Sequence, residues 1–215
     1  MTTEVETLVA RATVVAQRAR RTILGIAGPP GGGKSTLAQA VVAAVGSAAV
    51  LVPMDGFHLA QAELVRLGRR DRIGAPDTFD ALGYIALLRR LRERTEDVVY
   101  APAFRREIEE PIAGAIAVPR ATRLVVTEGN YLLVPDEPWA GVRALLDECW
   151  YADLDEPTRL RWLIQRHIDH GKTPEAAHEW VRRSDEVNAV VVAATRSRAD
   201  LVVRLPVCGA IGLLQ

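Results

Sequence analysis

Residues 28–35 read Gly-Pro-Pro-Gly-Gly-Gly-Lys-Ser and match the pattern G-x-x-x-x-G-K-[ST]. The apolar stretch TILGIA (22–27) precedes this loop, and TLAQAVVAAV (36–45) follows it with the composition of a helix. A buried strand before the loop and a helix after it are the context that distinguishes a phosphate-binding loop from a chance glycine-rich turn. We therefore interpret residues 28–35 as a phosphate-binding loop.

The chemistry of this loop predicts that it holds ATP and Mg²⁺. Glycines let successive backbone N–H groups point at one anion, and the following helix adds its positive N-terminal end. Pro29 and Pro30 have no N–H, so we expect the cradle to come mainly from residues 31–35. Lys34 should reach the β- and γ-phosphates, and the Ser35 hydroxyl should ligate Mg²⁺. The residues expected to contact ATP are Gly28, Gly31, Gly32, Gly33, Lys34, Ser35, Thr36 and Lys172.

The rest of the chain alternates short apolar stretches with helical ones. Strands are expected at 22–27, 48–54, 98–103, 112–118, 123–127, 148–153 and 200–205, and helices at 3–20, 36–45, 57–67, 81–94, 139–146, 156–170 and 174–196. Fully apolar strands between helices predict an α/β fold, in which helices cover both faces of a parallel sheet.

Length and charge narrow the class of protein. The chain has 215 residues, which suits one α/β domain, and its 27 basic residues equal its 27 acidic ones. A general nucleic-acid or membrane binder would show a basic excess, so we expect neither partner. Cys149 and Cys208 make no disulfide framework and lack metal-ligand spacing. With no signal pattern and no apolar run of ~18 residues, we expect a soluble cytoplasmic protein.

Two carboxylates are expected at the carboxyl ends of core strands, where α/β sheets bind ligands. Asp55 follows the stretch at 48–54, and Glu128 follows the stretch at 123–127. Either could be a turn or helix-capping residue. Beside a phosphate loop, Asp55 is suited to act as a base that accepts the proton of an attacking hydroxyl. Glu128 is suited to hold Mg²⁺ directly or through water.

The segment from about 159 to 175, here called the lid segment, carries several cations. We expect Arg166 and Lys172 to close over the transferred phosphate, and Arg159 and Arg161 to lie on a solvated helix face. The histidines at 167, 170 and 178 have no accompanying cysteine and no acid at a firm ligand position, so a zinc site is not expected.

Five runs occur in the order seen in one kinase family. They are MDGFHL (54–59), GAPDTFD (74–80), YAPAF (100–104), TEGNYLL (127–133) and W-x-x-x-R (162–166). With the phosphate loop, they make the chain resemble the phosphoribulokinase, uridine kinase and pantothenate kinase type of P-loop kinases, especially the small bacterial members labelled nucleoside/nucleotide kinase-like or fructose transport system kinase.

This resemblance implies a P-loop NTPase fold with a five-stranded parallel sheet, in a single domain spanning residues 1–215 with a substrate lobe at about 55–120. It implies ATP, Mg²⁺ and a small hydroxylated acceptor. Asp55, Lys34 and Arg166 match the catalytic positions, with Ser35 and Glu128 on the metal. The residues expected to contact the acceptor are Asp55, His58, Phe104, Arg106 and Glu128.

Several departures from the family pattern concern the acceptor. Gly74 stands where uridine kinases carry an aspartate that holds the ribose, and Leu163 stands where pantothenate kinases carry a tyrosine. Phe104 and Arg106 replace the two residues of the pantothenate kinase Tyr-x-His turn. Neither uridine nor pantothenate is therefore indicated as the acceptor.

Arg105 and Arg106 lie in the turn where related kinases hold their second substrate. Two guanidinium groups would suit an acceptor that bears a carboxylate or phosphate. Alternatively, the glutamates at 107, 109 and 110 neutralise both arginines on a solvated turn, where exposed pairs contribute only ~0–1 kcal/mol.

The sequence thus favours an ATP-dependent kinase that phosphorylates a hydroxyl of a small metabolite, such as a nucleoside, a sugar or a pantothenate-like compound. A GTPase is set aside, because neither lysine lies in an N/T-K-x-D segment. The alternative is a P-loop ATPase that acts as a regulatory or assembly factor. The identity of the acceptor stays open, as does the oligomeric state, for which a homodimer is one option.

Overall fold

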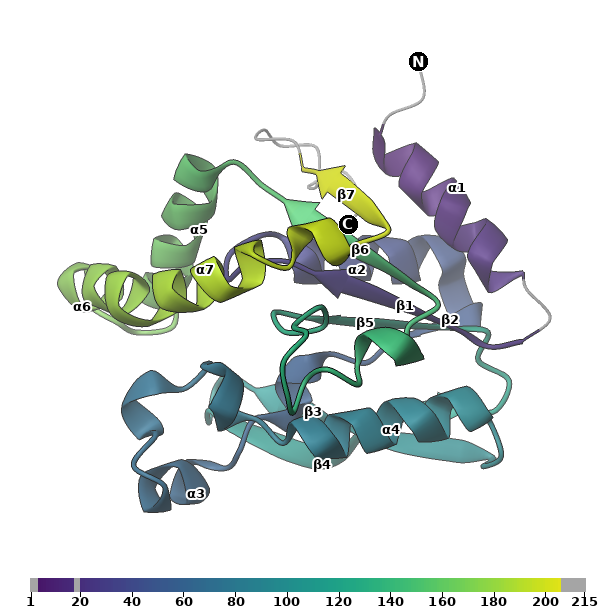
Figure 1. Ribbon diagram of the computed structural model, residues 1–215, viewed down its shortest axis with the longest axis horizontal. Coiled ribbons are helices and arrows are strands. Elements are labelled where there is room, and N and C mark those ends of the chain that lie inside the picture. Colours follow the sequence, from purple (N-terminus) through teal and green to yellow (C-terminus); the bar gives the residue numbers. More distant parts are fainter. Residues whose placement is uncertain (1–3, 18–19, 206–215) are drawn as a thin grey trace.

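A five-stranded parallel sheet forms the centre of the computed structural model, which describes residues 4–17 and 20–205 (Figure 1). The strand order is β2-β5-β1-β6-β7. The strands span Thr22–Ala27 (β1), Ala49–Leu51 (β2), Leu124–Gly129 (β5), Glu148–Asp153 (β6) and Leu201–Arg204 (β7). All six residues of β1 are buried, because β5 and β6 pair with its two edges and core residues of the helices pack against both of its faces. The predicted α/β fold with five parallel strands is confirmed.

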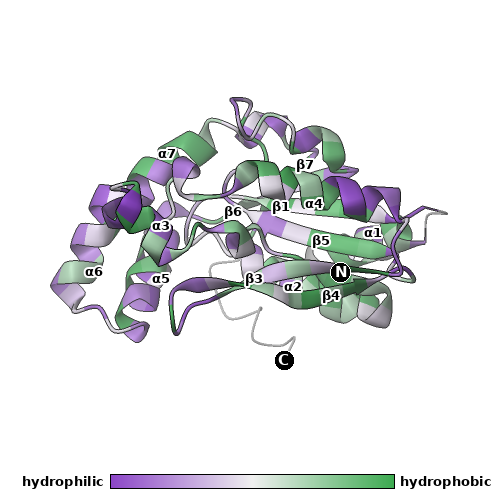
Figure 2. Cartoon of the chain, turned by 90° about the horizontal axis from the view of Figure 1, so that it is seen from below, coloured by the Kyte–Doolittle hydropathy of each residue, from purple (hydrophilic) through white to green (hydrophobic). Residues whose placement is uncertain are grey.

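Helices cover both faces of this sheet because side chains of a strand alternate between its faces. Leu24 and Ile26 of β1 belong to a core cluster with residues of α1 (Glu4–Ala16) and α2 (Lys34–Val45). Ile23 and Ala27 belong to a second cluster, to which α4 (Ala81–Glu93) contributes Tyr84, Leu88 and Leu91 among others. Figure 2 shows β5 as hydrophobic over part of its length and hydrophilic toward one end, and α6 as a mixture of hydrophilic and hydrophobic residues.

An antiparallel hairpin lies beside the main sheet, next to α4 (Figure 1). It consists of β3 (Val98–Arg105) and β4 (Glu110–Pro119), and the polar turn between them was expected. Its buried residues Val99 and Val118 join the cluster that contains α4. A Cβ atom on Gly56 would lie 2.4 Å from the carbonyl oxygen of Pro102, so the backbone after β2 packs directly against β3. This contact brings the hairpin to the phosphate-loop edge of the sheet.

Several of the expected elements are shorter than predicted or absent, among them the helix expected over 57–67, whose α-helical part spans Gln61–Arg66 only. β2 is limited to Ala49–Leu51, because residues Met54–Phe57 turn into a 3₁₀-helix before the short α3 (Gln61–Arg66). The helix predicted over 139–146 is wrong: this stretch consists of turns and one 3₁₀-helix, Arg143–Leu145. The buried Trp139 is held there by a hydrogen bond from its indole Nε1 to the carbonyl oxygen of Pro76, 3.1 Å away. Tertiary packing has overridden the helical pattern.

The helical region near the C-terminus also differs in detail. α5 spans Glu156–Asp169, as expected, but the single helix predicted over 174–196 is divided. It consists of α6 (Pro174–Trp180), five π-helical residues (Val181–Asp185) and α7 (Glu186–Ala193). A π-helical turn adds one residue to a helix and changes which side chains share a face.

The described ranges contain no helix that combines the length and the apolar composition needed to cross a membrane. Cys149 is buried and has a free thiol, whereas Cys208 lies outside the described residues.

The packing of α4 on the sheet leads to a prediction about stability. Leu88 is fully buried in the second cluster, whereas Leu82 on the same helix is 64% exposed. We expect Leu88→Ala to lower the free energy of unfolding by about 2–5 kcal/mol, because it leaves a cavity. Leu82→Ala, the matched control, should change it by less than ~0.5 kcal/mol. Denaturant unfolding of both variants measures the difference, and equal effects would contradict this packing.

Candidate active site

The phosphate loop lies between β1 and α2, at the carboxyl end of the sheet. The carbonyl oxygen of Pro29 accepts two hydrogen bonds inside the loop, from the Gly32 N–H at 3.0 Å and from Lys34 Nζ at 2.9 Å. The Gly32 N–H is therefore used within the loop itself. The first turn of a helix has no intrahelical acceptors for its N–H groups, so those of Lys34 and Ser35 are available to an anion.

The lid segment packs directly on this loop. Gly31 has a φ of +74°, and a Cβ atom there would lie 3.0 Å both from the carbonyl oxygen of Arg159 and from Cβ of Leu163. Only glycine combines that backbone conformation with such a close approach of α5. Leu163, which stands where pantothenate kinases carry a tyrosine, is fully buried at this contact. In this chain the side chain at that position therefore packs against the phosphate loop.

Lys34 is a buried cation, with 8% of the residue exposed. Burial lowers the pKa of its ammonium group to about 8, although the nearby carboxylates Glu128 and Asp55 act in the opposite direction. The cations Arg166 and Arg106 lower this pKa further. A buried, incompletely compensated positive charge of this kind favours the binding of an anion.

Ser35 and Glu128 together present oxygen atoms beside Lys34. The Ser35 hydroxyl donates a hydrogen bond to Glu128 Oε1 at 3.0 Å. The sequence predicts that Glu128 follows the strand. In the structure Glu128 lies within β5, because this strand extends to Gly129. Burial raises the pKa of this carboxyl group, and nearby Asp55 raises it further. Mg²⁺ prefers hard oxygen ligands and is usually held by one or two carboxylates plus substrate phosphates, so this hydroxyl and carboxylate fit that ion.

Asp55 lies in the 3₁₀-helix that follows β2. Its Oδ2 accepts a hydrogen bond from Arg106 Nη2 at 3.1 Å. Burial would raise the pKa of Asp55, but His58 and the cations Arg106 and Lys34 outweigh it and hold that pKa below its ordinary value. The carboxylate is therefore ionised at neutral pH. Lys34, Asp55 and Glu128 thus interact electrostatically at one edge of the sheet.

Aromatic rings line the side of the site away from the phosphate loop. The His58 ring lies 4.0 Å from Phe79 and 4.6 Å from Phe104, measured between ring centroids. His58 Nδ1 is hydrogen-bonded to the backbone oxygen of Asp55 at 2.7 Å, and burial lowers the pKa of this imidazole. The His58 ring therefore forms part of the cavity wall between Phe79 and Phe104.

A cavity of about 540 Å³ joins these groups. Its walls come from the phosphate loop, the 3₁₀-helix of Asp55, the hairpin and the lid segment. The sequence-predicted residues that line it are Lys34, Ser35, Asp55, His58, Phe104, Arg106, Glu128, Arg166 and Lys172. Gly74 lines the same cavity, with a φ of +96° and its carbonyl oxygen accepting a hydrogen bond from the Tyr131 hydroxyl.

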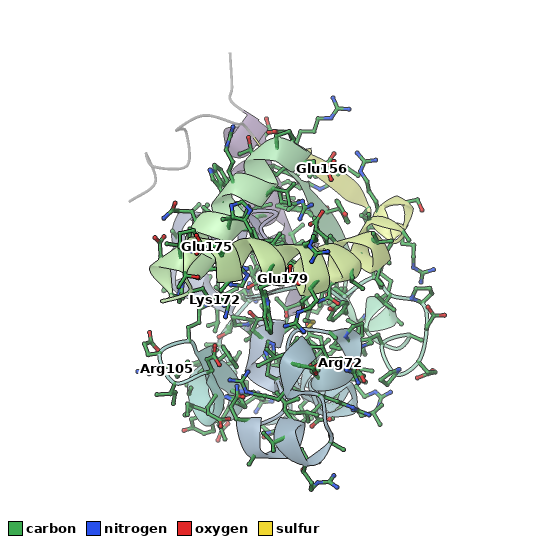
Figure 3. The ribbon with its side chains drawn as sticks, turned by 90° about the vertical axis from the view of Figure 1, so that its left-hand side faces the viewer. Arg72, Arg105, Glu156, Lys172, Glu175 and Glu179 are labelled. Atoms are coloured by element: carbon green, nitrogen blue, oxygen red, sulfur yellow. The ribbon has the colours of Figure 1, made fainter. Side chains whose placement is uncertain are left out.

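The lid segment supplies two of these cations in different settings. Arg166 is half-buried, and burial together with the neighbouring Arg106 lowers the pKa of its guanidinium group. Lys172 Nζ lies 4.8 Å from the centroid of the Trp180 ring, a cation–π contact. Figure 3 shows Lys172 on the side of the lid helices that is nearer to the lobe carrying Arg72 and Arg105.

The prediction that Arg159 lies on a solvated face is wrong. Its side chain is 6% exposed, and Nη1 donates to the carbonyl oxygen of Pro30 at 3.2 Å, while Nη2 pairs with Glu186 at 2.7 Å. Arg159 therefore links the phosphate loop to α7. Arg161 is exposed, as predicted, and donates to the Thr158 hydroxyl.

Some cavity residues were not expected from the sequence. Trp180 of α6, Asp185 of the π-helical turn and Asn188 of α7 line the cavity. His167 Nε2 lies 2.8 Å from Asp185 Oδ2. Asp185 lies in the π-helical turn, and the regular helical period of the sequence does not predict such a turn. Within the described part of the chain, no three His, Cys, Asp or Glu side chains are arranged to hold a metal ion by themselves.

Comparisons with known proteins agree with this geometry. The model of the Phosphoribulokinase / Uridine kinase family matches residues 23–210. A relative from Schizosaccharomyces pombe, named as a candidate uridine kinase, is 33% identical over 205 residues, covering 90% of this chain and 87% of the relative. A candidate fructose transport system kinase from Silicibacter sp. TM1040 has a crystal structure with 34% identity and a TM-score of 0.82, covering 96% of this chain and 100% of that one.

A more distant structure supports the fold alone. It is that of YFH7 from Saccharomyces cerevisiae, described as a candidate P-loop kinase with a circular permutation. It shares 18% sequence identity with this chain at a TM-score of 0.79, and the match covers 94% of this chain and 98% of that one.

The buried Arg159 yields a prediction about the lid segment. Arg159→Ala should lower the free energy of unfolding by about 2–3 kcal/mol, less than for a fully buried pair because 31% of the Glu186 side chain is exposed. It should also weaken the binding of an ATP analogue, since the phosphate loop loses the hydrogen bond between Arg159 and the carbonyl oxygen of Pro30. Arg161→Ala is the control and should alter neither quantity measurably. Unfolding curves and calorimetric titrations test both, and unchanged nucleotide affinity in Arg159→Ala would refute the link.

Proposed function

This chain belongs to the phosphoribulokinase/uridine kinase family, and we propose that it is an ATP-dependent kinase that phosphorylates a hydroxyl of a small metabolite. The observation that carries the proposal is the juxtaposition of Lys34, Asp55 and Glu128 in one cavity with Arg166. A phosphate-binding cation, a base and a metal-side carboxylate are the parts that phosphoryl transfer requires.

The phosphate loop holds ATP in this proposal. The glycines at 28, 31, 32 and 33, together with Thr36 and the N–H groups of the first turn of α2, surround the phosphates, and Lys34 neutralises the β- and γ-phosphates. Lys172 adds a cation from the lid segment. The lowered pKa of Lys34 supports this role, because an anion restores the charge balance that burial has disturbed.

Ser35 and Glu128 would hold Mg²⁺. Bound there, the ion would neutralise negative charge on the phosphates of ATP. Glu128 reaches Ser35 through a direct hydrogen bond, so the two ligands are already adjacent. Asp55 lies close enough to Glu128 to raise the pKa of the Glu128 carboxyl group, and this proximity supports a metal site next to the proposed base.

Asp55 acts as the base. The acceptor oxygen forms a bond to the γ-phosphorus, the bond from that phosphorus to the β–γ bridging oxygen breaks, and the hydroxyl proton passes to Asp55 as ADP is released. Arg166 neutralises charge on the transferring group, and closure of the lid segment excludes water. The acceptor lies against His58 and Phe104, whose rings line the cavity beside Asp55.

The alternative is a P-loop ATPase with a regulatory or assembly role. Such a protein needs no second pocket beyond the phosphates. Here the cavity extends from Lys34 past Asp55 to Phe104 and Arg106, which favours a kinase with a bound acceptor. One related protein is named for uridine and another for fructose transport, so these names do not identify the acceptor of this chain.

The direct test is transfer of the γ-phosphoryl group from ATP to a panel of nucleosides, sugars, polyols and vitamin precursors. We expect ATP consumption to depend on one class of acceptor, and Lys34→Ala to abolish transfer while the fold persists. In the wild type, nucleotide affinity should fall above about pH 8 as Lys34 loses its proton, approaching tenfold per pH unit. The Lys34→Ala variant should lack that slope. Rapid ATP hydrolysis independent of every acceptor would favour the ATPase.

A second experiment separates the two carboxylates. Asp55→Asn should lower kcat by ~10²–10⁴ with nucleotide binding nearly unchanged, because only proton transfer is lost. Glu128→Gln should instead raise the Mg²⁺ concentration needed for half-maximal rate. Steady-state kinetics at several Mg²⁺ concentrations measure both, and a near-normal kcat in Asp55→Asn would exclude Asp55 as the base.

A further inference from the structure

Arg106 projects from the hairpin turn to the base that we propose. Its Nη2 donates to Asp55 Oδ2 at 3.1 Å, although the two residues are 51 positions apart in the sequence. The Arg106 side chain is 46% exposed and lines the cavity. It is therefore accessible to a small molecule that enters beside Asp55.

The other charges near this turn have partners of their own. Arg105 pairs with Glu107 at 3.6 Å, and Arg70 pairs with Glu109 at 3.0 Å. The carboxylate of Glu110 accepts from the Gln61 N–H at 3.2 Å. The alternative that these glutamates neutralise both arginines therefore holds for Arg105, but in the described ranges the ion-pair partner of Arg106 is Asp55.

The charge of Arg106 is only partly compensated. Asp55 and Glu128 both also interact with Lys34 and Arg166, so two carboxylates are shared among three cations. A guanidinium group has five N–H donors in a planar fork, and in the described ranges the Arg106 side chain uses one of them in a hydrogen bond. The remaining donors match the geometry of a carboxylate or a phosphate.

We propose that Arg106 binds an anionic group of the acceptor and thereby places the acceptor hydroxyl beside Asp55. The acceptor class is a small hydroxylated compound that carries a carboxylate or phosphate a few bonds from the reactive hydroxyl. Arg106 keeps its contact with Asp55 through Nη2, so one side chain orients both the base and the substrate. This inference rests on the proposed kinase function and adds the chemical class of its acceptor.

Binding measurements with matched ligands test the proposal without requiring turnover. Calorimetric titrations in the presence of a non-hydrolysable ATP analogue and Mg²⁺ would use sets that share a carbon skeleton. Suitable sets are glycerol, glycerate and glycerol phosphate; ribose, ribonate and ribose 5-phosphate; and glucose, gluconate and glucose 6-phosphate. The carboxylate and phosphate members of each set separate the two sources of negative charge. The proteins are the wild type, Arg106→Ala, Arg106→Lys and the control Arg105→Ala.

We expect the tightest ligand to be anionic, with its Kd increased about tenfold or more by Arg106→Ala. Arg106→Lys, which keeps the charge but loses the planar fork, should give a smaller increase. Arg105→Ala should leave Kd unchanged, and the affinity for the ATP analogue should be the same in all four proteins. Tightest binding by a neutral member, binding of no anionic member, or equal weakening by Arg105→Ala would overturn the proposal.

Turnover of the bound ligand distinguishes this inference from the function on which it rests. If an anionic ligand binds through Arg106 but receives no phosphoryl group from ATP, the kinase proposal fails and the anion site stands. If a neutral compound is the best phosphoryl acceptor and Arg106→Ala leaves its KM unchanged, the kinase proposal stands and the anion site is wrong.

Discussion

The burial of one positive charge governs the arrangement of this site. Lys34 stands at the start of α2, inside a cradle of backbone, and donates to the carbonyl oxygen of Pro29. A buried cation is costly unless carboxylates or an anion compensate it. Asp55 and Glu128 supply part of that compensation, and they come from the 3₁₀-helix after β2 and from β5. The parallel sheet brings both to Lys34, because neighbouring parallel strands end at the same edge.

A second buried cation connects this centre to the lid segment. Arg159 on α5 contacts Pro30 on one side and Glu186 on the other, so the phosphate loop, α5 and α7 form one connected unit. Leu163, one turn further along α5, packs against Gly31. Because α5 is anchored at its N-terminal half, its C-terminal half carries Arg166 over the cavity. The π-helical turn before α7 adds Asp185 to the same wall.

The side of the cavity where we propose that the acceptor binds has a different construction, since it depends on a hairpin outside the main sheet. The close approach of Gly56 to Pro102 brings β3 next to the backbone that carries Asp55, and Arg106 then spans the gap. In the proposed mechanism, this ion pair has two opposed effects on Asp55 as the base. It helps to keep the Asp55 carboxylate ionised and oriented, and it lowers the proton affinity of that carboxylate. A loose phosphoryl-transfer transition state tolerates a weak base, because little proton transfer is needed early.

The sequence by itself determined the elements whose signals are local. The phosphate loop, the alternation of strands and helices, and the place of Asp55 just after a core strand could be predicted, because a glycine-rich pattern and apolar periodicity act over a few residues. Only the tertiary structure decided which charges meet. Arg159 has the same sequence signature as the exposed Arg161, and burial arises from the fit of α5 on the loop. The pairing of Arg106 with Asp55 joins residues far apart in the chain, and no local pattern encodes it. The same holds for Trp139, whose packing against Pro76 prevents a helix that its neighbours favour.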